Sequence, residues 1–247
     1  MSRVFKFFHF RQVFALLATF GLALAAITEV RADGFVVDKV YHPYVNPIER
    51  EIEFRSLYVV DDDPLVDGSQ LHRLGFAHAF AERFRGEIYL IAEDTPEDSL
   101  SLAAYEFELK WQLTEQGEYF VDWGLLFEYE LERDEDIQEF VSSVLVEKEL
   151  GAWNATLNLS AVYEWGDDIS NEWESELAAQ LRYRLSRGFE PALEIYSGDA
   201  FKGLGPVGVG QIRFGQGRKL RWELGVLFGV DRESPDQVLR AMLEYEF

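Results

Sequence analysis

The sequence predicts an all-β protein that folds as an antiparallel, up-and-down transmembrane β-barrel of about twelve strands. Segments of about ten residues alternate apolar with polar side chains, so each segment, as a strand, has one apolar and one polar face. After residue 32, no segment reaches the roughly 18 uncharged apolar residues that a transmembrane helix needs. The connections between the segments alternate between acidic loops and tight turns, as those of membrane barrels do.

Residues 1–32 have the pattern of a cleaved export signal. Arg3, Lys6 and Arg11 give a positive start, and residues 13–26 (VFALLATFGLALAA) form a short apolar core. Residues 30–32 then supply the small or aliphatic side chains expected at a cleavage site. An uncleaved membrane anchor is the alternative, and a lipoprotein is excluded because no cysteine follows the core.

Without residues 1–32 the chain is strongly acidic. That segment holds four positive residues and one negative residue, so its removal lowers the net charge from −22 to −25. Nucleic acid is excluded as a partner, because phosphate contacts need clustered Lys and Arg. Hydrophobic residues make up 48% of the chain, which argues against disorder, and the absence of cysteine excludes disulfide bonds.

Twelve strands are expected, and the fourth shows the alternation most clearly. There Tyr105, Phe107 and Leu109 alternate with Glu106 and Glu108. The sixth is the least regular. In order, the expected strands are residues 48–60, 71–81, 84–92, 101–113, 121–130, 137–148, 153–165, 173–184, 189–196, 205–214, 220–230 and 237–247.

Two strands carry signs of irregularity. Pro191 cannot donate a ladder hydrogen bond, which predicts a bulge or a strand end in the ninth strand. The tenth strand is rich in glycine, and its apolar phase shifts between Val209 and Ile212, which predicts a bulge there.

The connections predict which end of the barrel faces outward. The tight ones, several with positive charge, suit short periplasmic turns, and the acidic ones suit outer loops. Tryptophans support two interfacial belts, because four lie near the expected periplasmic strand ends and two near the outer ends. A soluble β-sandwich is the alternative. The acidic connections are residues 61–63, 94–98, 132–136, 166–172, 197–203 and 231–236, and the tight ones 82–83, 115–117, 149–151, 186–188 and 215–219.

The last strand is amphipathic and ends in an aromatic residue. Leu239, Ala241, Leu243, Tyr245 and Phe247 share one face. This resembles the C-terminal recognition strand of Gram-negative outer-membrane β-barrels. The resemblance implies the outer membrane as the location, Tyr245 and Phe247 as the assembly signal, and the barrel-assembly machinery, membrane lipid and lipopolysaccharide as partners.

The polar strand faces should line a lumen. Acids dominate the fourth to seventh strands, whereas arginines gather on the eighth, eleventh and twelfth and on the first three. The expected lumen residues are Glu51, Glu53, Arg55, Arg73, Arg85, Glu87, Glu106, Glu108, Lys110, Asp122, Glu128, Glu130, Glu147, Asn158, Glu164, Glu174, Glu176, Arg182, Arg184, Glu194, Arg221, Glu223, Arg240, Glu244 and Glu246.

Two interpretations follow from this lumen. One is a water-filled passive diffusion channel whose acids favour small cations or zwitterions. The other is a network of ion pairs that fills a narrow, non-conducting barrel, which would serve as a scaffold for a partner. Twelve strands lie between the filled eight-stranded size and the open sixteen-stranded size, so strand number allows both.

No pattern of catalytic residues is present, and no cofactor is expected. Beyond residue 32 the only histidines are His42, His72 and His78, without a Ser-His-acid spacing or a metal-ligand spacing. The acidic loops, with Asp61, Asp62 and Asp63 as weak candidates, offer hard oxygen ligands to divalent cations. The alternative is that these loops are simply solvated.

Residues 33–47 (DGFVVDKVYHPYVNP) precede the first strand and are rich in aromatic residues. They could form a periplasmic lead-in, a plug inside the lumen, or an extra strand. In size and strand number, residues 48–247 resemble the small twelve-stranded porins, such as the oligogalacturonate-specific channels. Those channels have basic lumens that suit acidic sugars, and this acidic lumen departs from that pattern.

Overall fold

The computed structural model describes residues 37–133, 136–167, 169–199, 201–215 and 217–247. The predicted export signal and residues 33–36 lie outside the described residues. The described residues belong to one compact unit. No helix in the described part of the chain has the length and apolar character needed to cross a membrane.

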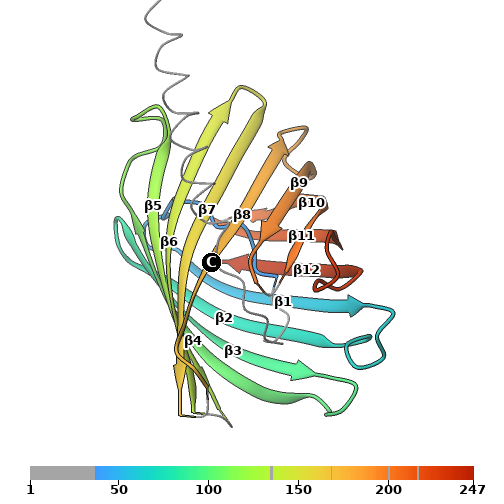
Figure 1. Ribbon diagram of the computed structural model, residues 1–247. Helices are drawn as coiled ribbons and strands as arrows, with labels where there is room; N and C mark the ends of the chain where they lie inside the picture. The colour runs from blue at the N-terminus through green and yellow to red at the C-terminus, as the bar shows by residue number, and fades with distance from the viewer. Residues whose placement is uncertain (1–36, 134–135, 168, 200, 216) are drawn as a thin grey trace, which may run out of the picture. The chain divides into compact units, whose positions relative to one another are not determined.

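Twelve antiparallel strands close into a barrel, which confirms the predicted fold class. Each strand pairs with its neighbour in sequence, and β12 pairs with β1, with Phe54 opposite Leu243. Figure 1 shows this order around the wall, from β1 in blue to β12 in red. The strands are β1 Arg50–Val60, β2 Gln70–Ala81, β3 Phe84–Asp94, β4 Ser101–Gln112, β5 Asp122–Glu132, β6 Ile137–Leu150, β7 Trp153–Gly166, β8 Glu172–Tyr183, β9 Glu190–Ser197, β10 Lys202–Gly215, β11 Arg218–Gly229 and β12 Gln237–Glu246.

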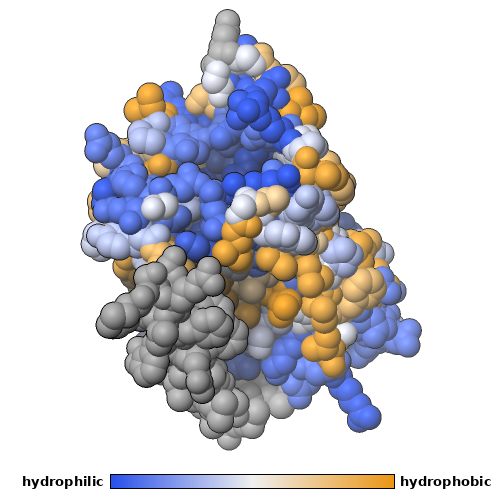
Figure 2. Space-filling view, turned by 90° about the horizontal axis from the view of Figure 1, so that it is seen from above, coloured by the Kyte–Doolittle hydropathy of each residue, from blue (hydrophilic) through white to orange (hydrophobic). Residues whose placement is uncertain are grey.

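The barrel buries charge and exposes apolar side chains, the reverse of a soluble protein. Glu53 and Arg240 point inward and are 0% and 2% exposed, whereas Phe107 and Leu224 point outward and are 44% and 58% exposed. In the space-filling view, hydrophilic residues gather in the upper and left part, and hydrophobic residues lie mainly in the lower middle and on the right (Figure 2). Such a surface is stable in lipid, because strand pairing satisfies the backbone while apolar side chains contact acyl chains.

The irregularity of the tenth strand lies elsewhere than predicted. The β10–β11 register is continuous from Val207 to Arg213 and shifts only between Arg213 and Gly215, at the turn. Val209 faces inward and Ile212 outward, as unbroken alternation requires. The predicted bulge at 209–212 is therefore wrong. The apparent shift of phase arises because Val209 is apolar but faces inward, in the buried cluster that includes Val37 and Val40 of the segment inside the barrel. Pro191 is the second residue of β9, so the prediction of a strand end there is confirmed.

Residues 37–46 have no regular secondary structure and lie inside the barrel. We call them the lumenal segment. They form no ladder with any strand, so the interpretation of this part of the chain as an extra strand is wrong.

Candidate functional site

Most of the predicted lumen residues lie on the inner face of the wall. Those buried are Glu51, Glu53, Arg55, Arg73, Glu87, Glu106, Glu108, Lys110, Asp122, Glu147, Asn158, Glu194, Glu223, Arg240, Glu244 and Glu246. Those of intermediate exposure are Arg85, Glu128, Glu130, Glu164, Glu174, Glu176, Arg182 and Arg221. Arg184 is the exception, since it is exposed beyond the end of β8 and pairs there with Glu149. The period-two geometry of a strand places these side chains inward while their apolar neighbours face outward.

Amide side chains of the wall hold the backbone of the lumenal segment. The Asn158 side chain accepts from the Tyr41 amide at 2.7 Å and donates to the Tyr41 carbonyl at 2.8 Å. Gln112 accepts from the Val45 amide at 2.7 Å. These bonds stand in for the ladder partners that an irregular buried backbone lacks, and buried backbone polar groups need such partners.

Polar side chains of the lumenal segment bind the same wall. The Tyr44 hydroxyl donates to Asp122 at 2.7 Å, and His42 Nδ1 lies 2.5 Å from Glu147. Apolar contact adds to this, because Tyr41 packs in a buried cluster with Leu126 and Leu145. The segment is therefore held by side chains of β4, β5, β6 and β7.

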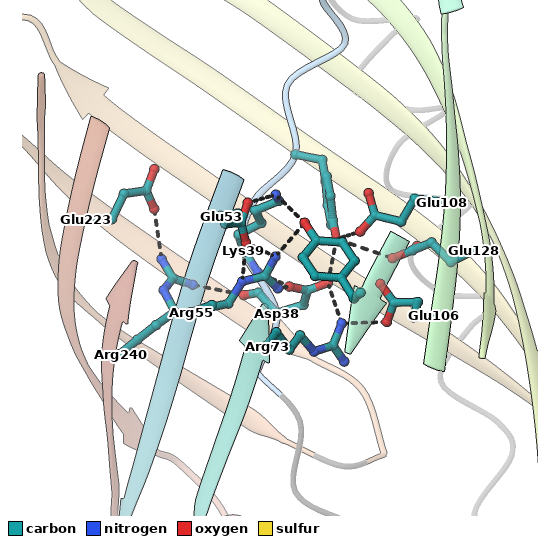
Figure 3. Close-up of polar contacts among 12 residues, drawn as sticks. Asp38, Lys39, Glu53, Arg55, Arg73, Glu106, Glu108, Glu128, Glu223 and Arg240 are labelled. Atoms are coloured by element: carbon teal, nitrogen blue, oxygen red, sulfur yellow. Dashed lines mark hydrogen bonds and ion pairs between the residues drawn. The ribbon is translucent and has the colours of Figure 1, made fainter. Parts of the chain in front are cut away.

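Ion pairs attach the start of the lumenal segment to the opposite side of the barrel (Figure 3). Asp38 pairs with Arg55, its carbonyl accepts from Arg240 at 2.8 Å, and Lys39 pairs with Glu53. Burial alone lowers the pKa of Lys39, but Glu53 and other nearby carboxylates raise it more, so its pKa lies above the ordinary value. Lys39 therefore stays charged inside the lumen.

The Tyr41 hydroxyl faces three carboxylates and has one proton to donate. Its oxygen lies 2.8 Å from Asp38, 2.6 Å from Glu108 and 3.3 Å from Glu128. Burial and the nearby carboxylates hold the pKa of Tyr41 above its ordinary value, so the phenol stays protonated. A hydroxyl donates one hydrogen bond, so Tyr41 satisfies one of these carboxylates at a time.

An acidic row crosses five neighbouring strands. In the strand register Glu106 lies opposite Glu130, Glu130 opposite Glu139, Glu139 opposite Glu164, and Glu164 opposite Glu172. Like charges directly opposite one another are destabilising, so the row concentrates negative charge on one side of the lumen. We call these five residues the glutamate row.

Arg73 contacts one end of the glutamate row. Its guanidinium lies 2.6 Å from Glu106 and 3.8 Å from Glu130. Glu139 and Glu172 were missed as lumen residues at the sequence level. Their positions in the row follow from pairing between strands, which alternation within one strand does not specify.

Arginines gather on β1 to β3, β8, β11 and β12, and we call this side of the barrel the basic wall. Its arginines have acids on the same side. Arg240 pairs with Glu194 at 2.7 Å and with Glu223 at 3.4 Å, and Arg221 pairs with Glu244 at 3.0 Å. The basic wall is thus largely neutralised locally. The net acidity of the lumen rests on the β4–β8 side, where the glutamate row lies.

The loop carboxylates Asp61, Asp62 and Asp63 do not form a compact group. Asp61 accepts from the amides of Asp63 at 2.7 Å and Asp236 at 3.1 Å, and Asp63 accepts from the Leu65 amide at 3.0 Å. The carboxylates of Asp61 and Asp63 therefore stabilise the loop backbone. Within the described residues, close groups of three acids occur in the lumen instead, as Glu51 with Glu53 and Glu87, Glu51 with Glu244 and Glu246, and Glu106 with Glu108 and Glu128.

A cavity of about 280 Å³ opens beside the lumenal segment. Residues 39–42, Tyr44 and Asn46 line one side of it, and residues near the start of β1 and the end of β12 line the other. Lys110, Arg85, Arg182 and Arg221 also face it. Charged groups of both signs therefore border this space.

Solved outer-membrane barrels share this architecture. The COG4313 outer membrane channel from Pseudomonas putida F1 is 14% identical, with a TM-score of 0.59 over 85% of this chain and 99% of that chain. The KdgM porin in complex with disordered oligogalacturonate is 11% identical, with a TM-score of 0.53 over 80% and 98% of the two chains. The NanC porin is 10% identical, with a TM-score of 0.52 over 79% and 98%.

The chain has the fold of the small outer-membrane porins. At these identities the likeness establishes the fold alone. No protein-family model matches the chain, and no curated protein matches it significantly.

Proposed function

We propose that this protein is a passive diffusion channel for small polar solutes in the outer membrane, narrowed by the lumenal segment. One observation carries the proposal. The closed barrel has a charged and polar interior, and in the described part of the chain the hydrogen bonds between the lumenal segment and the wall involve side chains and no strand ladder. A polar interior is typical of barrels that contain water, and an element without ladder hydrogen bonds leaves the wall intact if it shifts.

Comparison with the known proteins supports the same function. The barrels reported above are a channel and two porins, and each is covered almost completely by the match. The exposed apolar outer face fits membrane lipid, with lipopolysaccharide in the outer leaflet. The aromatic C-terminal strand fits recognition by the barrel-assembly machinery.

A preference for cations is part of the proposal. The glutamate row is a continuous arc of acids on the β4–β8 side, and a low-dielectric wall focuses the field of such charges into the lumen. The effect should grow at low salt, because the Debye length rises from about 10 Å at 0.1 M to about 30 Å at 0.01 M.

The runner-up function is a non-conducting scaffold for a partner in the outer membrane. The cluster of Asp38, Lys39, Arg55, Glu53 and Arg240 favours it, because these residues fill the lumen beside β1 and β12. If the lumen of the protein does not conduct ions, the scaffold is the function.

Planar-bilayer conductance of the refolded protein tests the proposal. We expect ohmic current from the wild type and a larger one from Asn158→Ala combined with Gln112→Ala, because both amides hold the lumenal segment. Ser143→Ala is the matched control, since Ser143 is buried on the inner face but bonds Ser160 and not the segment. If neither the wild type nor the double variant conducts, the scaffold replaces the channel.

A further inference from the structure

Two carboxylates of the wall lie directly opposite each other and share one hydrogen-bond donor. Glu108 on β4 and Glu128 on β5 are partners in the strand register. Both contact the Tyr41 hydroxyl, at 2.6 and 3.3 Å, and among the described residues neither carboxylate forms an ion pair. Like charges directly opposite one another repel. A positive charge between the two side chains would remove that repulsion.

Glu106 adds a third carboxylate to this pair. One oxygen from each of Glu106, Glu108 and Glu128 lies within 4.8 Å of the other two, and we call the three residues the triple-glutamate cluster. Glu106 is 3% exposed, and Arg73 bonds only its Oε2, so its Oε1 is buried without a hydrogen bond. Figure 3 shows the oxygen that Arg73 leaves free turned toward Glu128. A buried acceptor without a partner carries a desolvation cost, which a bound cation would remove.

The Tyr41 hydroxyl cannot satisfy the carboxylates around it. Asp38 also approaches the phenol oxygen, at 2.8 Å, so three carboxylates surround a hydroxyl that has one proton. The other two contacts between oxygen atoms are repulsive unless a further positive charge lies close by. This excess of oxygen atoms over protons points to a cationic ligand.

The charges connected to the triple-glutamate cluster leave an excess of acid. We count every charged residue that is joined to the cluster by a chain of ion pairs, hydrogen bonds and contacts with the Tyr41 ring. The acids are Asp38, Glu53, Glu106, Glu108, Glu128 and Glu130, and the bases are Lys39, Arg55, Arg73 and Lys110. Six acids against four bases leave two negative charges, which one divalent cation would neutralise.

The two other close groups of acids, both around Glu51, already contain cationic side chains. Their ion pairs are Glu51 with Arg85, Glu53 with Lys39, Glu87 with Arg85, Glu244 with Arg221, and Glu246 with Lys219. In the triple-glutamate cluster, only Glu106 has such a partner. The cluster is therefore the group of acids in the described lumen that is best suited to a metal ion.

We propose that the triple-glutamate cluster binds one Ca²⁺ ion, with Glu106, Glu108 and Glu128 as its protein ligands and water completing the shell. Carboxylate oxygens are hard ligands, and Ca²⁺ takes six to eight oxygens at about 2.3–2.6 Å in variable geometry. Two ligands of one ion can therefore lie up to about 5 Å apart, and the cluster meets that limit.

Solvent reaches this part of the lumen. The side chains of Asp38 and Glu130, which neighbour the cluster through Arg73, are each 25% exposed. Glu106 is also one end of the glutamate row, whose field would raise the local concentration of cations. The inference goes beyond the proposed function, because it assigns a ligand to the interior whether or not the barrel conducts.

Ca²⁺ titrated into the refolded full-length barrel tests the site. Isothermal titration calorimetry is carried out in nonionic detergent without lipopolysaccharide, after treatment with EDTA, in about 0.1 M KCl to screen weak binding. We expect saturable binding of one Ca²⁺ ion. Glu108→Gln combined with Glu128→Gln should weaken it about tenfold or more, because two charged ligands are lost while side-chain size is kept. If circular dichroism shows that the double variant does not refold, Glu128→Gln alone replaces it, with a weaker affinity than the wild type expected.

Glu164→Gln combined with Glu172→Gln is the matched control. It removes the same two charges from the other end of the glutamate row, where these residues lie opposite each other. The control should bind Ca²⁺ nearly as tightly as the wild type. The proposal is overturned if Ca²⁺ does not bind saturably, or if the Glu108 and Glu128 variant binds it as tightly as the wild type. Equal losses in both double variants would also overturn it, because Ca²⁺ would then only screen the lumenal acids.

Conductance is measured separately in planar bilayers. Binding of Ca²⁺ that depends on Glu108 and Glu128, in a barrel that does not conduct, would reject the channel and keep the site. Conductance without such binding would keep the channel and reject the site.

Discussion

Gly124 on β5 and Pro43 of the lumenal segment are so close that position 124 has no room for a side chain. A Cβ built on Gly124 would lie 2.9 Å from Cα of Pro43 and 3.1 Å from its carbonyl oxygen. Glycine at this inward position therefore admits the backbone of the segment. Gly75 makes room for the Tyr89 side chain in the same way, because a Cβ at position 75 would lie 2.4 Å from the Tyr89 ring.

Substitution of Gly124 should displace the lumenal segment. In Gly124→Val we expect a larger single-channel conductance than in the wild type, because the β-branched side chain suits the strand but overlaps Pro43. Planar-bilayer recording measures it. Gly86→Val is the control, since Gly86 faces outward and a Cβ there would come no closer than 3.5 Å to its nearest neighbour, Phe80, which is ordinary contact. Unchanged conductance in Gly124→Val would contradict the packing of the lumenal segment against β5.

A charge on the outer face should destabilise the barrel in lipid. Phe107 lies in the middle of β4 and is 44% exposed to the outside. Phe107→Arg should lower the free energy of unfolding by about 2–4 kcal/mol if the position lies near the bilayer midplane. Urea unfolding from lipid vesicles measures this. Leu65→Arg, in the loop after β1, should change little, and equal costs at both positions would contradict the assignment of the lipid face.

Removal of the C-terminal aromatic residues should impair assembly more than folding. The rings of Tyr245 and Phe247 stack at 5.8 Å, and the Phe247 amide donates to the Arg50 carbonyl at 2.9 Å. Tyr245→Ser with Phe247→Ser should reduce the amount of protein in the outer membrane while refolding in detergent continues. Phe214→Ser is the control, because Phe214 is an outward aromatic on β10, outside the recognition strand. Normal membrane levels of the double variant would remove the role assigned to this strand.

The glutamate row should set ion selectivity. Glu106→Gln, Glu130→Gln and Glu139→Gln together remove three adjacent charges of the row and should shift the reversal potential toward zero or to the anion side. Salt-gradient recordings in planar bilayers measure this, with a larger difference expected at low salt. Glu97→Gln, in the loop between β3 and β4, is a control that removes one charge outside the lumen. Selectivity that stays the same in the triple variant would show that the row does not face the conducting path.

The sequence by itself determined the wall of this barrel. Alternation such as that of residues 105–113 decides which side chains face lipid and which face inward, because the strand period of two acts within each strand. Twelve such strands with short connections leave few alternatives to a meander, and the last pairs with the first because closure removes both sheet edges.

Only the tertiary structure decided what fills the barrel. Residues 37–46 show no regular alternation of apolar and polar side chains. Their partners Asn158, Gln112 and Gly124 lie about 70 to 120 positions away in the chain. The glutamate row likewise arises from the register between neighbouring strands. Alternation assigns a side chain to a face, but its neighbours on that face depend on the register between strands and on the backbone that the lumen encloses.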